Sequence, residues 1–409
     1  MTDTTKKRAS TGNIKKERVL VVGGGFGGTK AALELADDPH FSVSLLSPHT
    51  ELRYYPTLYH TATGGKRSNS SIPLSTIFAG KSVKLIHACA QTLDRAAKTM
   101  TTEDGAVIPF DTLIMAIGVR TNYFGIKGLQ EYSFSIKAQD EVERFKAHLH
   151  KQLGDTHRPD VHYVIVGAGP TGIELAGALP DYLQRIMKCH GLPPHQVHID
   201  LIERSSRLLP RMPRDTSRMV ERQLKRLGIR IYFNSAVQGV TADELTLNGK
   251  PIRSHTVIWT AGTTNHPFFA DNHFVVMGQG KVAVDTYLQA ENNIFVIGDN
   301  ANTPFSGLAQ TALHDGAFIA KNLRRRARGK KFKSYIAKQP ITVIPAGPHW
   351  AAVNMGNLRI YGWLGYALRE AADLIGFHDL ESWPQAAKQF MSKFGTQDNC
   401  DVCAHAEIE

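Results

Sequence analysis

A chain of 409 residues, with 42% hydrophobic and 21% charged residues, has the composition of a globular protein with two or three domains. No apolar run approaches the ~20 residues of a transmembrane helix, and residues 1–17 are too polar for a secretory signal. The net charge of +11 favours an anionic membrane surface as partner; no nucleic-acid-binding motif is present, so we expect no nucleic acid. Four cysteines do not make a disulfide framework and fit a reducing cytosol.

The first strong signal is a glycine-rich turn after a polar, lysine-rich tail that we expect to be disordered. The sequence predicts a strand at Arg18–Val22 and a helix at Gly28–Ala36, joined through Gly23, Gly25 and Gly28 in G-x-G-x-x-G spacing. The first glycine allows a tight turn, the second lets a pyrophosphate approach the backbone, and the third lets helix and strand pack closely. The helix N-terminus attracts phosphate, so a dinucleotide site is predicted.

The next strand, Phe41–Leu46, ends in Ser47, where this kind of site usually carries an acid for the ribose hydroxyls. A serine can make one such hydrogen bond instead of two. The match is therefore weaker at the ribose, although the phosphate-binding turn remains. Downstream, DTLIMAIG at Asp111–Gly118 predicts a buried strand, residues 120–128 a crossover between domains, and residues 137–153 a helix.

A second glycine turn lies in YVIVGAGPTGIELAG, Tyr163–Gly177. An apolar strand precedes Gly167, Gly169 and Gly172, a helix follows, and the next strand ends in Glu203, which can hydrogen-bond both ribose hydroxyls of NADH. Because strand, helix, second strand and acid occur in order, we predict a second dinucleotide site; an ordinary glycine turn is the alternative. Two such sites suggest FAD held by the first and NAD(P)H by the second.

Three later segments complete the two domains. A strand with a small-residue turn is predicted at Thr256–Gly262, and NIFVIGD at Asn293–Asp299 places an acid where it can reach the ribityl or pyrophosphate part of a flavin. Ser306–Asn322 begins as a loop and becomes a helix whose first part would face the flavin ring. The basic run Arg324–Lys333 is most simply a solvated helix end.

The C-terminal region predicts two amphipathic helices. The first has apolar residues at helical spacing, with charged residues on the opposite face: Tyr361, Leu364, Leu368, Ala372 and Ile375 against Arg369, Glu370 and Asp373. The second begins at the N-cap Ser382 and carries the stripe Trp383, Ala387, Phe390 and Phe394. Packing on the protein's own core and lying on a membrane or partner are equally compatible with this pattern.

Together these motifs resemble the type II NADH:quinone oxidoreductases, a group of flavoproteins with two dinucleotide-binding domains. The resemblance covers Arg18 to about Phe377 and depends on VLVVGGGFGG, DTLIMAIG, VIVGAGPTGIELAG, VIWTAG, IFVIGD and AQTALHDG. It implies an α/β fold of two Rossmann-like domains with a C-terminal amphipathic membrane-surface segment. It also implies transfer of two electrons from NADH through FAD to a membrane quinone, without proton pumping, by a peripheral protein on the cytoplasmic side of the cell membrane.

The resemblance also implies domain boundaries and site residues. Residues 1–17 would form the tail, 18–121 and 281–338 the FAD domain, 122–280 the NADH domain, and 339–409 the membrane-associated segment. The residues expected to bind FAD are Gly23, Gly25, Gly28, Ser47, Ala90, Gly118 and Asp299. Those expected to bind NADH are Gly167, Gly169, Gly172, Glu203 and Gly262. Glu174 would handle a proton or place the nicotinamide, and Gln310 and His314 would lie on the quinone side.

The chain departs from the family pattern at three places. Ser47 replaces the acid at the FAD ribose, and His314 replaces the second glutamine of A-Q-x-x-x-Q, which would alter the quinone preference and the pH dependence. The third departure is the charge of the tail, where Arg369, Glu370 and Asp373 predict weak membrane attachment.

Other functions remain open from the sequence. A sulfide:quinone oxidoreductase needs cysteines at the flavin, yet Cys89, Cys189, Cys400 and Cys403 all lie outside the flavin-facing motifs. A soluble ferredoxin or rubredoxin reductase shares both glycine turns but gives no reason for the amphipathic tail. A non-catalytic NADH-binding redox sensor, and a homodimer, are also compatible. Cys400-Asp401-Val402-Cys403 could be a redox pair or metal site, but with only His405 nearby we expect a disordered tail and no metal.

Overall fold

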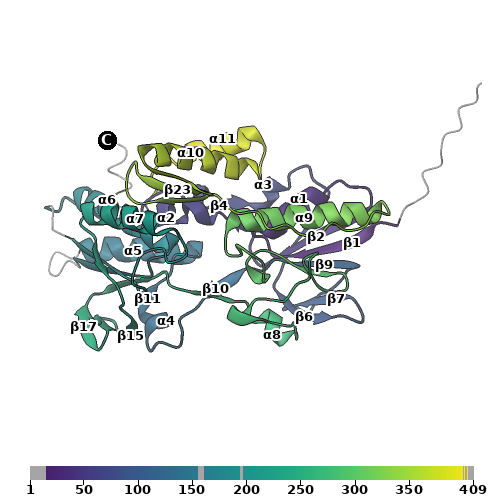
Figure 1. Cartoon of the computed structure of the whole chain (residues 1–409), viewed down its shortest axis with the longest axis horizontal. Coiled ribbons are helices and arrows are strands. Elements are labelled where there is room, and N and C mark those ends of the chain that lie inside the picture. Colours follow the sequence, from purple (N-terminus) through teal and green to yellow (C-terminus); the bar gives the residue numbers. More distant parts are fainter. Residues whose placement is uncertain (1–14, 155–160, 194–196, 399, 401–402, 404–409) are drawn as a thin grey trace, which may run out of the picture.

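The computed structural model describes residues 15–154, 161–193, 197–398, 400 and 403 (Figure 1). Most of the expected N-terminal tail lies outside these residues, and Glu17 already belongs to the first strand. The chain forms two bodies side by side, each built on a mainly parallel sheet, with the C-terminal helices along one edge of both (Figure 1).

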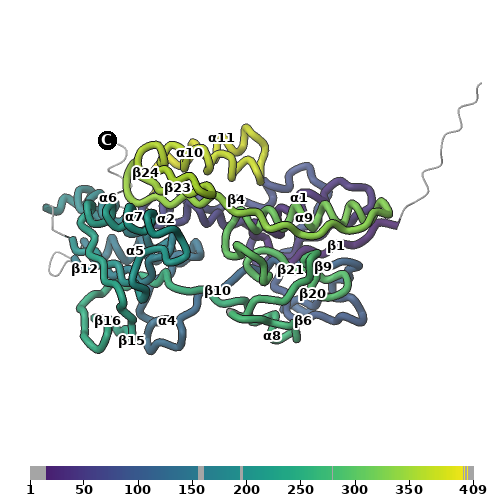
Figure 2. The backbone as a smooth tube through the Cα atoms, in the orientation of Figure 1, coloured from purple at the N-terminus to yellow at the C-terminus, as the bar shows by residue number. Residues whose placement is uncertain are grey.

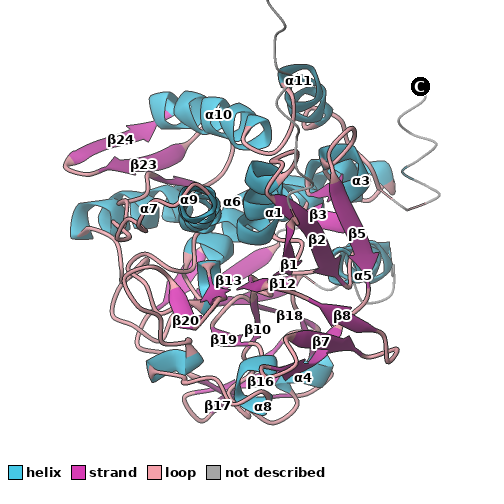
Figure 3. Cartoon of the chain, turned by 90° about the vertical axis from the view of Figure 1, so that its right-hand side faces the viewer, coloured by secondary structure: helices cyan, strands magenta, loops and turns pink. Residues whose placement is uncertain are grey.

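The first body is built on a six-stranded sheet. Its strands in spatial order are β20 (Gln289–Glu291), β21 (Ile294–Val296), β9 (Thr112–Met115), β1 (Glu17–Val22), β2 (Phe41–Ser47) and β5 (Val83–His87). All pairs except β20–β21 are parallel, and the central strands β1 and β9 carry the continuous apolar runs expected of strands buried on both faces. Helices α1 (Phe26–Leu35) and α9 (Ala309–Ala327) pack side by side on one face, as Figure 3 shows with α9 seen end-on.

The other face of this sheet packs on a small antiparallel sheet and a short helix. These elements are β6 (Ala90–Asp94), β7 (Thr99–Thr102), β8 (Val107–Pro109) and α8 (Phe268–Asp271). Shorter elements near the C-terminal helices are β3 (Glu51–Arg53), α2 (Leu58–Ala62), β4 (Ser71–Pro73) and α3 (Leu74–Ile77).

The second body is built on a five-stranded parallel sheet. Its strands in order are β11 (Ser133–Phe134), β18 (Thr256–Trp259), β12 (His162–Val166), β13 (His198–Ile202) and β14 (Arg230–Tyr232). Helices α5 (Gln139–Gly154), α6 (Pro170–Cys189) and α7 (Arg214–Arg226) cover one face. The opposite face carries α4 (Leu129–Tyr132), β15 (Val237–Val240), β16 (Glu244–Leu247) and β17 (Lys250–Arg253).

The two bodies are joined by a pair of antiparallel strands, β10 (Val119–Thr121) and β19 (Thr263–Asn265). The tube in Figure 2 shows these strands running between the bodies. The crossover expected at residues 120–128 therefore begins in β10, and the chain returns through β19 immediately after the small-residue turn at Gly262.

The C-terminal unit is a three-stranded antiparallel sheet followed by two helices. The sheet consists of β22 (Thr342–Pro345), β23 (Ala351–Met355) and β24 (Leu358–Gly362), and the helices are α10 (Trp363–His378) and α11 (Trp383–Ser392). Gly365 lets α10 lie directly on the sheet, because a Cβ there would come within 2.2 Å of Ala351 O. The expected N-cap is confirmed, since Ser382 and Gln385 form a capping box.

The orientation of α10 contradicts the idea of a charged outer surface. Arg369 and Asp373 are only 6% and 1% exposed, whereas Leu364 and Ile375 are 61% and 56% exposed. Arg369 Nη1 donates to Asp373 Oδ1 at 2.5 Å, and Lys393 Nζ of the chain after α11 donates to Asp373 Oδ2 at 2.8 Å. The premise for weak attachment is therefore wrong, because the charges bind one another inside the protein and the apolar face is left outside.

We predict that Asp373→Asn loosens the C-terminal unit, because it leaves two cations buried with less compensating charge. Removing one partner of a buried ion pair costs about 3–5 kcal/mol. Native-state proteolysis should then cleave near α10 and α11 much faster than in the parent protein. Asp243→Asn, at a carboxylate whose side chain is 81% exposed, is the matched control. Equal cleavage rates in both variants would show that the cluster does not hold the helices.

Candidate functional site

The first glycine turn has the geometry of a pyrophosphate-binding turn. Gly23 has φ +113°, and a Cβ at Gly28 would come within 2.0 Å of Gly23 O. Gly25 is different, because nothing lies within 4 Å of its Cβ position, and it is the N-cap of α1 without a side-chain cap. The first N–H groups of α1 have no side-chain cap, and Gly25 leaves room beside them, which suits an anion.

The second turn repeats this geometry at α6. Gly167 has φ +105°, Gly172 packs against Gly167 O, and Gly169 has open space at its Cβ position. Glu203, only 9% exposed, follows β13 and accepts hydrogen bonds from Ala168 N at 2.9 Å and from Ser205 N at 2.7 Å. The Glu203 carboxylate is thus fixed beside the glycine turn, so that one nucleotide could contact both the carboxylate and the turn.

Ser47 lies at the end of β2, as expected, but its hydroxyl is already engaged. Its Oγ donates to His49 O at 2.9 Å and accepts from His49 N at 3.2 Å. The hydroxyl of Ser47 could therefore only accept one further hydrogen bond from a ribose. The contact between Ser47 and FAD stays a prediction. Ala90 is half-buried in β6, in register with Thr102, and its predicted flavin contact also stays a prediction.

Asp299 lies in the short turn after β21, where burial raises its pKa and the nearby Lys281 and Lys137 counteract this rise. Among the described residues, Lys137 Nζ is buried without a hydrogen-bond partner, and burial lowers its pKa to about 8. A buried, unpaired ammonium near an acid and open glycine turns fits a polyanionic group such as the pyrophosphate of FAD. The sequence analysis missed Lys137 because it lies far from Asp299 in the chain.

Gly118 and Gly262 flank the connection between the bodies. Gly118 has φ +76° with open space at its Cβ position, and its N–H donates to Asn300 Oδ1 at 2.8 Å. Asn300 is fully buried and also donates to Asn265 Oδ1, so it ties the β9 turn to β19. Gly262 has φ +83°, and a Cβ there would strike the Phe124 ring. Asn300 is a further residue that the sequence analysis missed.

Glu174 lies on α6, close to the charged side of α10. Burial raises the pKa of Glu174 to about 8, Arg369 counteracts this shift, and Asp373 adds to it. The same surroundings contain Tyr59 of α2, whose pKa burial also raises while Arg369 lowers it. The C-terminal helix therefore contributes directly to the environment of Glu174, and a neutral carboxyl that can carry a proton lies there at neutral pH.

Gln310 and His314 line one pocket of about 410 Å³, so the structure brings these two predicted residues together. Gln310 Oε1 accepts from Ile341 N at 3.1 Å, and His314 Nε2 lies 3.0 Å from Ile336 O, to which an N–H there would donate. The segment after α9 thus covers both side chains. The charged residues of the lining are Lys30 of α1, Lys338 of the covering segment and Asp379 after α10.

Asp315, next to His314, was not singled out from the sequence. It is fully buried, accepts from Gly298 N at 3.0 Å and from Tyr335 Oη at 2.6 Å, and burial raises its pKa to about 6 despite these hydrogen bonds. It connects the helix that carries Gln310 and His314 to the turn that carries Asp299. Only the fold brings these segments together.

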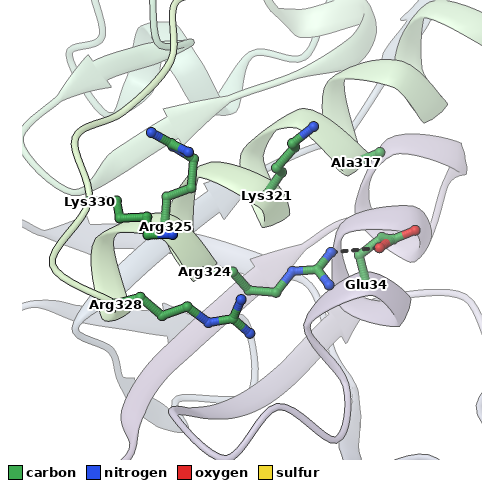
Figure 4. A pocket seen from close by; sticks show the side chains of 7 residues that line it. All are labelled: Glu34, Ala317, Lys321, Arg324, Arg325, Arg328 and Lys330. Atoms are coloured by element: carbon green, nitrogen blue, oxygen red, sulfur yellow. Dashed lines mark hydrogen bonds and ion pairs between the residues drawn. The ribbon is translucent and has the colours of Figure 1, made fainter.

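The basic run ends α9 beside a pocket lined by cationic side chains (Figure 4). Arg324 pairs there with Glu34 of α1 at 2.7 Å, and Arg326 pairs with Glu17. Lys321, Arg325, Arg328 and Lys330 also line this pocket. The run is thus a helix end that is partly neutralised by ion pairs.

The raised pKa of Glu174 gives a testable stability profile. Between 4.5 and about 8 the folded chain binds more protons at Glu174 than the unfolded chain, so stability falls as pH rises through this window. The slope is at most about 1.4 kcal/mol per pH unit. Glu174→Gln should remove this slope, so the melting temperatures of variant and parent should diverge in favour of the variant as pH rises. Parallel curves would contradict a raised pKa.

Comparison with known proteins agrees with this geometry. A family model described as pyridine nucleotide-disulphide oxidoreductase matches residues 17–316. A curated relative, the type II NADH:quinone oxidoreductase NdhA of Mycobacterium tuberculosis, is 25% identical, covering 89% of this chain and 85% of the relative. The resemblance seen in the motifs is therefore confirmed.

Two solved structures share the fold. NDH2 of Plasmodium falciparum in complex with NADH has a TM-score of 0.81 at 17% identity, covering 93% of this chain and 98% of that one. The sulfide:quinone oxidoreductase of Aquifex aeolicus has a TM-score of 0.76 at 20% identity, covering 95% and 98%. The predicted α/β fold with Rossmann-like sheets is confirmed. With the match to the family model, these findings show that the chain belongs to the pyridine nucleotide-disulphide oxidoreductase family.

Proposed function

We propose that this protein is an FAD-dependent enzyme that passes two electrons from NADH to a quinone without pumping protons. The observation that carries this proposal is the pair of open glycine turns on two separate sheets, in a chain whose relatives are named for this reaction. We assign the first sheet, with residues 18–121 and 281–338, to FAD and the second, with residues 122–280, to NADH.

In the FAD site, the N–H groups at Gly25 and the start of α1 bind the pyrophosphate. Lys137 Nζ gains an anionic partner, and Asp299 lies beside it in the turn after β21. Bound FAD would supply the hydride-accepting, two-electron chemistry of the reaction. The protein places and shields the reacting groups.

In the NADH site, the start of α6 binds the pyrophosphate and Glu203 accepts hydrogen bonds from the ribose hydroxyls. A 2′-phosphate would meet this carboxylate, so NADH is preferred over NADPH. Arg207 does not offset this preference, because its guanidinium donates to Met212 O in its own loop and to Ser217 Oγ of α7. Glu174 holds a proton on its carboxyl group near the nicotinamide.

The quinone site is the pocket of Gln310 and His314. A side-chain amide and an imidazole can each donate to a quinone oxygen. Gln310 contacts the covering segment through its carbonyl oxygen, which accepts from Ile341 N, so its amide N–H groups can donate to a quinone without breaking this contact. A quinone that accepts from His314 Nε2 must instead displace Ile336 O. By resemblance to the family, we assign this pocket to the side of the flavin opposite NADH, which suits two successive half-reactions.

The cysteine positions disfavour sulfide chemistry. Cys89 lies in the loop before β6, and Cys189 at the end of α6 pairs with Cys403. Cys400 lies against His190. In the part of the chain that the structure describes, none of the four belongs to a glycine turn or to the Gln310 pocket. Turnover with NADH and a quinone separates the enzyme from a non-catalytic redox sensor.

We predict that His314→Ala and Gln310→Ala slow only the second half-reaction. In stopped flow of the FAD-loaded protein, NADH should bleach the flavin at the parent rate. Reoxidation by a soluble quinone should slow about ten-fold or more, which corresponds to losing about 1.4 kcal/mol of transition-state binding.

Lys321→Ala, two turns further along α9 and outside this pocket, is the control and should change neither rate. Unchanged reoxidation in both pocket variants would remove the quinone assignment. Absence of flavin bleaching by NADH in the parent protein would remove the whole proposed function.

We also propose that the protein lies on the membrane surface through its C-terminal unit. The exposed apolar residues of its two helices and the chain just after them are Trp363, Leu364, Leu368, Ile375, Trp383, Met391 and Phe394. Helices α10 and α11 lie along one outer edge of the molecule, so both can reach a flat surface (Figure 1). No helix among the described residues could cross a bilayer. The net charge of +11 suits the anionic cytoplasmic leaflet of a membrane. The expected homodimer stays a prediction.

We predict that Leu364→Glu weakens binding to anionic vesicles about ten-fold, because it removes about 1.5 kcal/mol of apolar burial and adds a negative charge. Val107→Glu is the matched control, since Val107 is equally exposed (60% against 61%) but lies on β8. Co-sedimentation with vesicles at low and high salt measures the membrane binding of both variants. If both variants bind as the parent does, α10 does not touch the membrane.

A further inference from the structure

The C-terminal C-x-x-C sequence does not form the free tail expected of it. Cys403 is buried, at 6% exposure, and Cys400 is half-buried, and both lie against the ends of α5 and α6. The expected partner His405 lies outside the described residues. Two other histidines, His150 of α5 and His190 at the end of α6, take its place beside the cysteines. The sequence analysis missed them because they precede the cysteines by more than 200 residues.

Four donor atoms converge here within 4.8 Å of one another. His150 Nδ1 lies 3.1 Å from His190 Nε2, which lies 3.5 Å from Cys400 Sγ, and Cys403 Sγ lies 3.8 Å from His150 Nδ1. Zinc bonds of about 2.0–2.1 Å to nitrogen and 2.3 Å to sulfur imply tetrahedral edges of about 3.3 Å between nitrogens and 3.6 Å between nitrogen and sulfur. The observed separations are close to these edges.

The groups behind the four donors favour metal binding. His150 Nε2 faces Asp398 Oδ1 at 3.5 Å and Tyr182 Oη at 3.3 Å. A carboxylate beside Nε2 orients the His150 ring so that its Nδ1 lies toward His190 and Cys403, as in zinc sites whose histidine is oriented by a carboxylate.

In the structure, Cys403 is paired with Cys189 at the end of α6. A disulfide and a metal therefore compete for the same sulfur, and reduction frees Cys403 for a metal. Cys189 and His190 are adjacent, so either state holds the C-terminal end of the chain at the same place on α6.

We propose that the reduced chain binds one zinc ion through His150, His190, Cys400 and Cys403. The chemistry of two thiolates and two imidazoles at tetrahedral spacing selects zinc over the oxygen-preferring cations. The ion fastens the segment that follows α11 to α5 and α6. It thereby links the exposed apolar helices to the helix that begins with the second glycine turn.

The test uses the full-length, FAD-loaded protein purified with a non-thiol reductant and supplied with zinc. Elemental analysis after gel filtration should give about one zinc per chain, as for a structural site. Cys400→Ser and His190→Ala should lose it while keeping their FAD. Cys89→Ser, at the cysteine outside the cluster, should keep both. Cobalt in place of zinc should give tetrahedral thiolate bands at wavelengths beyond the flavin absorption.

Cys189→Ser decides between the two roles of this cluster. It cannot form the disulfide, yet it should keep zinc, because Cys189 is not among the four ligands. If the reduced parent protein holds no zinc and shows no cobalt bands, the site does not exist and the cluster serves the disulfide alone. Loss of zinc in Cys189→Ser to the same extent as in Cys400→Ser would also overturn this ligand set.

Discussion

The buried carboxylate of Asp373 determines how the two C-terminal helices, α10 and α11, are arranged. It lies between Arg369 of α10 and Lys393 of the chain after α11. Lys393 also donates to Glu370, so two acids of α10 hold the end of α11. Such a cluster is costly to remove from water and tolerates little displacement. Because the charged side of α10 faces the protein interior, its apolar side faces the solvent.

The same cluster connects the surface to the chemistry. Arg369 donates to Pro56 O in the short 3-10 helix just before α2, and it lies near Glu174 of α6. A helix that would lie on a membrane therefore also sets the charge around the group proposed to hold a proton near the nicotinamide. The two long helices extend this arrangement: α6 runs from the second glycine turn to the cysteine–histidine cluster, and α9 runs from the Gln310 pocket to the basic end.

The sites predicted from the sequence differ in how well they could be located. The glycine turns needed only local information, because positive φ, close packing and an open N-terminus follow from three residues at fixed spacing. Lys137, Asn300 and Asp315 could not be found in this way, since each acts on a turn from another part of the chain. For α10, the periodicity predicted an apolar face and a charged face. It did not indicate that the charged face would be buried by the ion pairs of Asp373.

The sequence by itself determined the two sheets, the two dinucleotide turns and the family, because alternation, helix periodicity and glycine spacing are local properties of the chain. Only the tertiary structure decided the outward apolar face of α10, the raised pKa of Glu174, and the meeting of His150 and His190 with Cys400 and Cys403. These features depend on burial and on contacts between distant residues. Their energies arise only when charged and polar groups are removed from water together.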